Sequence, residues 1–138
     1  MRNELVKEVW IDAPVGEVFK CFTDEEAMLT WHGKEVELNP VPGGVYRVLF
    51  ENGDAIVGQF KEVDSNRRVV YEANFGKLRT QVEVSFSEHN NGTFVRIRQE
   101  FFFEGDFSSF NHGWDYFLSI LRNKWNENSS ISDCELPK

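Results

Sequence analysis

Few side chains in this sequence have the types and spacing that catalysis or metal binding requires. The three histidines, His32, His89 and His112, stand apart, and the two cysteines, Cys21 and Cys134, form no Cys-x-x-Cys pair. A zinc site takes three or four clustered ligands, so the sequence predicts no metal and no other cofactor. It contains no Gly-x-Ser-x-Gly nucleophile motif and no glycine-rich phosphate loop, and we assign no catalytic residue.

His32 is the histidine of most functional interest because it directly follows the second predicted helix. A neutral imidazole there can hydrogen-bond a ligand or act as a general base, and the alternative is a solvated loop residue. We expect His112 to face water and His89 to be inert in a polar loop. Cys21 lies on the first predicted helix, where we expect it to behave as a small apolar residue.

Gln99 is a polar residue within an apolar strand pattern. It shares its alternation with Val95, Ile97 and Phe101, so its amide is expected to point toward the interior. A buried amide without a partner costs about 1–3 kcal/mol. Gln99 must therefore bond a neighbour, a water molecule or a polar group on a ligand.

The first third of the chain predicts one strand and two short helices. Residues 5–11 have a strand-like bias, and apolar residues at 15, 18, 19 and 22 have the spacing of an amphipathic helix. Thr23 or Asp24 can cap a second short helix that runs through Trp31 and is closed by Gly33.

From residue 35 the pattern becomes strand-like, with about six strands up to residue 103. Asn52-Gly53 predicts a tight hairpin, and the alternation at 78–86 is the clearest strand. Gly58, isolated within a strand at 55–63, predicts a bulge or a sharp bend. The short connections favour antiparallel pairing.

The last predicted element is a long helix that begins at Asp106 or Ser108. Its apolar face consists of Phe110, Trp114, Phe117, Leu118, Leu121 and Trp125. A meander of strands must cover its apolar face, and only this helix is long enough to do so. The sequence thus predicts an α+β fold, in which a curved antiparallel sheet of about six to seven strands wraps around the C-terminal helix. Residues 1–128 are expected to form one domain, and 129–138 a polar tail.

Composition excludes several classes of partner. The chain carries 23 Asp and Glu against 15 Lys and Arg, a net charge of −8, and no basic stripe, which argues against nucleic acid. It has no run of 18 uncharged apolar residues and no signal peptide, so we expect no membrane insertion and a cytoplasmic location.

Several short motifs occur in an order typical of one superfamily. They are Ile11-Asp12-Ala13-Pro14-Val15-x-x-Val18-Phe19, Phe22-Thr23-Asp24 leading to Trp31, Pro42-Gly43-Gly44-x-Tyr46, Gly58-x-x-x-x-Val63-Asp64, the run from Arg68 to Tyr71, and Gly113-Trp114 with Leu118 and Leu121. Across residues 5 to 126 the chain resembles the helix-grip (START-like, Bet v 1-like) superfamily. Within it, the chain is most similar to the bacterial branch that resembles the C-terminal domain of the activator of Hsp90 ATPase.

This resemblance implies a fold and a range of functions. Members bind lipids, polyketides or flat aromatic compounds, and a few catalyse cyclisation or hydrolysis. The chain departs from the pattern at Trp31-His32, where such sequences often carry two adjacent Trp residues. The eukaryotic activator also uses a separate N-terminal domain, for which 138 residues leave no room.

The architecture and the resemblance together predict an internal apolar cavity, unless the same side chains simply pack against one another. The residues predicted to bind a ligand are Trp31, His32, Tyr46, Val48, Phe60, Tyr71, Phe75, Gln99, Trp114, Phe117, Leu118 and Leu121. The expected function is non-catalytic binding of a small hydrophobic molecule, as a carrier or sensor. The alternatives are a cyclase or hydrolase that uses the same cavity, and a protein-interaction module with a chaperone partner.

Overall fold

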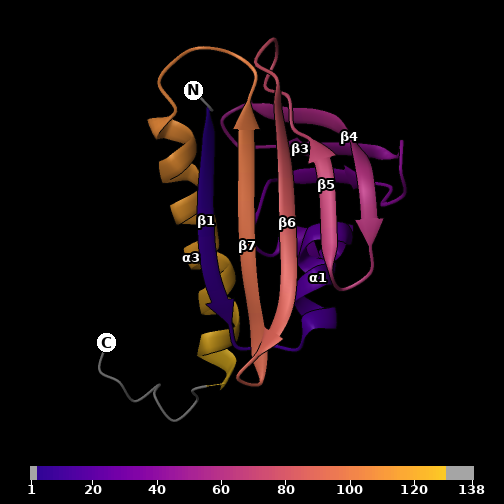
Figure 1. Cartoon of the computed structure of the whole chain (residues 1–138), viewed down its shortest axis with the longest axis vertical. Helices are drawn as coiled ribbons and strands as arrows, with labels where there is room; N and C mark the ends of the chain where they lie inside the picture. The colour runs from indigo at the N-terminus through magenta and orange to yellow at the C-terminus, as the bar shows by residue number, and fades with distance from the viewer. Residues whose placement is uncertain (1–2, 130–138) are drawn as a thin grey trace.

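The computed structural model describes residues 3–129 and places helices on one side of a curved sheet (Figure 1). Ser129 is the last residue of the final helix, and the rest of the predicted tail lies outside the described residues. The elements are β1 (Glu4–Ile11), α1 (Val15–Thr23), α2 (Glu25–Leu29), β2 (Glu35–Leu38), β3 (Val45–Leu49), β4 (Ala55–Asp64), β5 (Arg68–Glu72), β6 (Thr80–His89), β7 (Gly92–Phe101) and α3 (Ser108–Ser129).

Within residues 3–129, seven strands form one sheet in the order β1-β7-β6-β5-β4-β3-β2, and every neighbouring pair is antiparallel. Strand β1 joins the far edge by pairing with β7, the last strand, and the others form a continuous meander. The predicted α+β fold, with its curved antiparallel sheet and long C-terminal helix, is confirmed.

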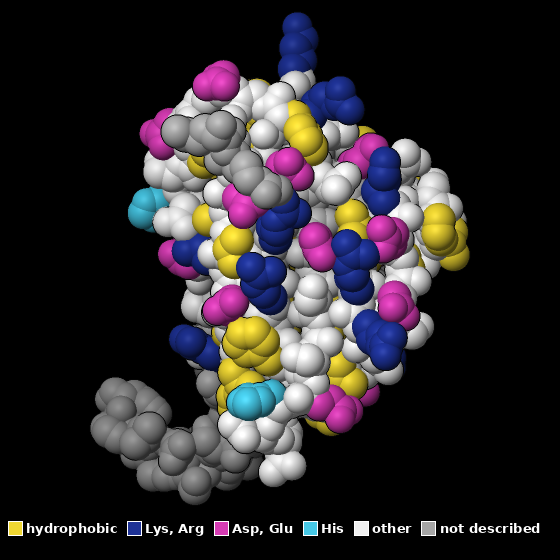
Figure 2. Space-filling model, viewed as in Figure 1, with side chains coloured by type: hydrophobic (Ala, Val, Ile, Leu, Met, Phe, Trp, Pro, Cys, Tyr) yellow, Lys and Arg dark blue, Asp and Glu magenta, His cyan; other side chains and the backbone are white. Residues whose placement is uncertain are grey.

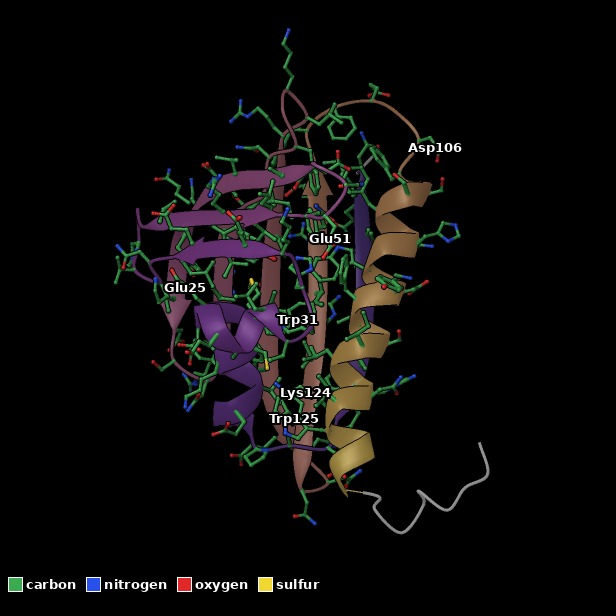
Figure 3. All side chains as sticks on the ribbon, turned by 180° about the vertical axis from the view of Figure 1, so that it is seen from behind. Glu25, Trp31, Glu51, Asp106, Lys124 and Trp125 are labelled. Carbon is green, nitrogen blue, oxygen red and sulfur yellow. The ribbon has the colours of Figure 1, made fainter. Side chains whose placement is uncertain are left out.

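The sheet bends sharply along β4, so that β2, β3 and the start of β4 run across the other strands (Figure 3). The pairing register shifts between Phe60 and Glu62, so the bulge lies at residue 61, three residues after Gly58 and in the strand that bends. Gly58 serves a different purpose: a Cβ atom there would lie 2.0 Å from the Glu72 carbonyl oxygen. The backbones of β4 and β5 approach too closely at this point for any side chain.

Two strands end earlier than the alternation of apolar residues at 69–75 and at 95–103 predicts. Strand β5 stops at Glu72, and Phe75 instead forms an isolated bridge with Leu78 across a turn at Gly76, where φ is +61°. Strand β7 stops at Phe101, because the chain turns there and the Phe101 ring stacks on Phe107, with ring centroids 4.2 Å apart.

The helices cover the concave side of the sheet. Asp24 caps α2 by accepting a 3.0 Å hydrogen bond from the Ala27 amide, as one of the two predicted caps. Helix α3 packs most closely on β1, where Lys7 and Asp115 form a 2.7 Å ion pair. No helix among residues 3–129 is long and apolar enough to span a membrane.

The opposite, convex face of the sheet is covered by charged side chains of both signs (Figure 2). Arg98 on β7 forms ion pairs with Glu4 on β1 and Glu83 on β6, and Arg68 on β5 also pairs with Glu83. Oppositely charged residues therefore alternate across neighbouring strands, and this face needs no covering layer.

Candidate ligand-binding site

A large cavity of about 1370 Å³ lies between α3, the segment after α2, the β3–β4 hairpin and the inner face of β5–β7. Figure 3 shows Trp31 on the inner side of the sheet, between the early helices and α3. Small-molecule sites typically measure about 300–1,000 Å³, so this volume can hold a ligand of ordinary size.

Seven of the twelve predicted residues line this cavity: Trp31, His32, Tyr71, Phe75, Gln99, Trp114 and Phe117. They come from five separate parts of the chain. The fold therefore brings together side chains that are up to 86 positions apart, between Trp31 and Phe117.

The other five predicted residues do not line the cavity and instead fill the core: Tyr46, Val48, Phe60, Leu118 and Leu121, each at most 6% exposed. Tyr46 lies behind Tyr71, with the two rings stacked at 3.9 Å. Burial, together with the neighbouring Tyr71, raises the pKa of Tyr46 well above its usual value of 10.

The apolar face of α3 is divided between the core and the cavity. Leu118 and Leu121 are buried, whereas Trp114 and Phe117 line the cavity and are only partly buried. The reason is that α3 lies closest to the edge strand β1, so that part of its apolar face stands away from the sheet.

Sequence reasoning missed several lining residues, among them Phe50, Ile56, Leu78, Val82, Phe103, Phe110 and Ile120. Some of them carried a usable signal. Phe50 shares its strand face with Tyr46 and Val48, and Phe110 is the first residue of the predicted apolar face of α3.

Gln99 connects α3 to the sheet through a buried chain of hydrogen bonds. The indole Nε1 of Trp114 donates to Gln99 Oε1 at 2.8 Å, and Gln99 Nε2 donates to Thr80 Oγ1 at 2.8 Å. The Thr80 hydroxyl in turn donates to the Ala73 carbonyl oxygen at 2.6 Å. The Gln99 amide was expected to bond a neighbour, a water molecule or a ligand, and in the structure it bonds neighbouring residues.

His32 is buried, at 7% exposure, and is not the solvated loop residue that was the alternative. Its ring stacks on Trp31, with ring centroids 4.7 Å apart. It makes T-shaped contacts with Phe50 and Phe117, at centroid distances of 5.1 and 4.4 Å. Desolvation by this aromatic surrounding lowers the pKa of His32 to about 3. The imidazole is therefore neutral at physiological pH.

Nothing in the described residues is arranged as a metal site or a reactive thiol. Residues 3–129 contain no group of three or more His, Cys, Asp or Glu that could hold a metal ion. Cys21 is 1% exposed, and burial raises the pKa of its thiol to about 11, so the nucleophilic thiolate is scarce at neutral pH.

Comparison with solved structures shows the same fold in several bacterial proteins. CV1439 from Chromobacterium violaceum is 22% identical, covers 89% of this chain and 96% of its own, and superposes with a TM-score of 0.79. Aha1 from Colwellia psychrerythraea, a dimer in solution, is 19% identical to this chain. The match covers 88% of this chain and 95% of Aha1, with a TM-score of 0.78. DynU16, from the dynemicin biosynthetic locus, is 19% identical, covers 94% of this chain and 48% of its own, and gives 0.81.

The family model is the more specific finding. No curated protein matches the chain significantly. The model described as activator of Hsp90 ATPase homolog 1-like protein matches residues 12–124, which span both early helices, the sheet from β2 to β7 and most of α3. The resemblance inferred from the motifs is thus confirmed, and the chain belongs to the family of activator of Hsp90 ATPase homolog 1-like proteins.

Proposed function

We propose that this protein binds a small hydrophobic molecule, lipid-like or flat and aromatic, in the cavity under α3, as a non-catalytic carrier or sensor. The observation that carries the proposal is the state of the lining aromatics. Phe50, Phe75, Trp114 and Phe117 are only partly buried although each packs against the core. An apolar occupant would cover them, and covering apolar surface contributes about 25 cal/mol per Å² before association costs.

The exposed apolar side chains support entry of such a molecule at the same place. Six large apolar side chains of the described chain are more than 40% exposed: Leu29, Val57, Leu78 and Tyr116 line the cavity, and Val41 and Phe102 do not. Most of the exposed apolar side chains thus belong to the cavity and not to a patch elsewhere. We therefore favour a small ligand over a protein partner.

Catalysis is not part of the proposal because neither the imidazole of His32 nor the thiol of Cys21 is suited to it. A general base works best when its pKa lies near the operating pH. His32, the histidine available to the cyclase or hydrolase alternative, has its pKa lowered to about 3 by burial. The thiol of Cys21 is shifted in the opposite direction, to about 11.

The test is a ligand screen by NMR chemical-shift perturbation with fatty acids, flavonoid-like aromatics and polyketide-like compounds. The expected result is saturable shifts at His32, Trp114 and Phe117, with little change at the buried Leu121. A well-dispersed spectrum that no compound perturbs would overturn the proposal and favour a protein partner.

A further inference from the structure

The charged side chains that line the cavity are all carboxylates. Glu51 and Asp54 lie in the β3–β4 hairpin, and Asp106 lies in the loop that leads into α3 (Figure 3). No Lys or Arg of the described chain lines the cavity. Three exposed cations, Lys34, Lys77 and Arg79, directly adjoin lining residues in sequence, and the Lys124 ammonium donates to the hydroxyl of the lining residue Thr30 at 2.9 Å. We call Glu51, Asp54 and Asp106 the acidic rim.

The acidic rim acts against anionic ligands. A carboxylate that enters an apolar site loses hydration, and this cost is repaid only by a cation or by hydrogen-bond donors. Here the lining supplies no cation, and the rim adds like-charge repulsion that salt screens. A free fatty acid is therefore poorly matched to this cavity, although its alkyl chain would fit the apolar lining.

His32 supplies a second and independent indication of the ligand. Its Nδ1 is the one buried side-chain nitrogen or oxygen without a hydrogen-bond partner in the described chain. Neither ring nitrogen bonds another residue, and only Nδ1 is shielded from solvent. Nε2 is therefore the polar atom of His32 that an occupant of the cavity can reach.

The surroundings of His32 define what can reach Nε2. Trp31 and Trp114 lie nearly parallel to the imidazole, at ring-centroid distances of 4.7 and 6.5 Å, and Phe117 meets it edge-on. Flat aromatic groups pack well on such rings. In the tautomer that carries its proton on Nδ1, the neutral imidazole presents an acceptor at Nε2, to which a ligand hydroxyl group can donate and an ether cannot.

We propose, on the basis of the ligand-binding function above, that the occupant is an uncharged, hydroxylated aromatic compound whose hydroxyl group bonds Nε2 of His32, and that the acidic rim rejects its anionic analogues. The hydroxyl gives Nε2 a hydrogen-bond partner, and the shielded Nδ1 keeps none. The aromatic ring covers the half-buried faces of Trp114 and Phe117.

Three naphthalenes of similar size test this assignment: 2-naphthol, 2-methoxynaphthalene and 2-naphthoate. Their affinities are measured on the full chain at pH 7 by displacement of the neutral fluorophore N-phenyl-1-naphthylamine. The methyl ether is more apolar than the naphthol but cannot donate a hydrogen bond. We expect naphthol to bind about fivefold more tightly than the ether, the value of one net hydrogen bond, and about tenfold or more tightly than naphthoate.

Two variants identify the residues responsible. His32→Phe keeps an aromatic ring and removes the nitrogen, so it should abolish or reverse the preference for naphthol over its ether. The rim variant Glu51→Gln/Asp54→Asn/Asp106→Asn should narrow the gap between naphthol and naphthoate by roughly threefold at low salt, and the gap should respond less to added salt.

A matched control separates the rim from net charge. Glu8→Gln/Glu37→Gln/Glu88→Gln removes the same number of carboxylates from exposed positions that do not line the cavity. This control should leave the discrimination between naphthol and naphthoate unchanged.

The outcomes distinguish this inference from the function on which it rests. If neither the fluorophore nor any naphthalene binds saturably, the proposed function fails, and the inference fails with it. If the fluorophore binds but the ether or naphthoate equals naphthol, or if His32→Phe retains the preference, only the ligand assignment is overturned.

Discussion

The indole nitrogen of Trp114 and the amide oxygen of Gln99 are joined by a 2.8 Å hydrogen bond that crosses from α3 to β7. Trp114 is partly buried and lines the cavity, whereas Gln99 is 2% exposed. The bond therefore fixes an aromatic wall of the cavity to the centre of the sheet, and it also gives the buried amide oxygen of Gln99 a hydrogen-bond donor.

Gln99→Leu should destabilise the protein because it removes the amide that bonds both Trp114 and Thr80. The Trp114 N–H loses its acceptor, and the Thr80 hydroxyl retains only its bond to Ala73. We expect a loss of about 1–3 kcal/mol in the free energy of unfolding, measured by urea denaturation.

A double-mutant cycle with Trp114→Phe tests whether this loss comes from the bond itself. Phenylalanine keeps an aromatic ring but has no N–H, so removal of Gln99 in that background should cost about 0.5–1.5 kcal/mol less. Strictly additive losses would show that the two residues contribute independently.

His32→Phe should leave the protein at least as stable at neutral pH and should flatten its acid dependence. In the folded chain the pKa of His32 is lowered from 6.5 to about 3 by burial, so the unfolded state binds the extra proton between these values. Wild-type stability is complete above pH 6.5 and falls as pH decreases toward 3, by at most about 1.4 kcal/mol per pH unit from this residue.

The measurement is the difference in unfolding free energy between wild type and His32→Phe from pH 7 to pH 4. The carboxylates contribute equally to the pH dependence of both proteins, so their contribution cancels in the difference between the two unfolding free energies. The exposed His112, changed to Gln, is the matched control and should follow the wild-type curve. A constant difference across this range would mean that His32 accepts a proton in the folded protein.

Phe117 and Leu121 lie one turn apart on α3 and should respond in opposite ways to truncation. Leu121 is fully buried, so Leu121→Ala should cost about 2–5 kcal/mol of stability but leave affinity for N-phenyl-1-naphthylamine nearly unchanged in the folded protein. Phe117 lines the cavity and is partly buried, so Phe117→Ala should weaken binding by about tenfold at a smaller cost in stability. Equal effects of both changes would indicate that Phe117 is ordinary core.

Gly58→Ala should be among the most destabilising single changes in the chain. The new Cβ would lie 2.0 Å from the Glu72 carbonyl oxygen, which forces β4 and β5 apart. We expect a loss above about 3 kcal/mol by thermal or urea unfolding. Gly113→Ala is the control, because its Cβ would meet no atom within 4 Å and alanine favours a helix by up to about 1 kcal/mol.

The order of elements was predictable because it rests on local patterns. The helical spacing of residues 15–22, the cap at Asp24 and the alternation at 78–86 depend on neighbours in sequence. The division of the α3 face was not predictable. Helical spacing shows that an apolar face exists, but whether Leu118 or Trp114 meets the sheet depends on where the helix lies across β1.

The burial of His32 could not be predicted from local sequence patterns either. The ring is covered by Trp31 beside it, by Phe50 at the end of β3 and by Phe117 on α3. Two of these three contacts exist only after the hairpin and the last helix have folded over the segment. A polar residue after a short helix gives no sign of this in the sequence.

The angle of the bend in β4 determines how far the β3–β4 hairpin lies from α3, and so determines the width of the cavity. The β3–β4 hairpin and α3 both line the cavity, and the hairpin continues into the strands that carry α3 through the bend in β4. At ~3.4 Å per residue, the hairpin tip lies roughly 20 Å from Phe60, so a rotation of ~5° there moves the tip by ~2 Å. A small rotation at the bend would therefore change the width of the cavity by an amount comparable to half the thickness of an aromatic ring system.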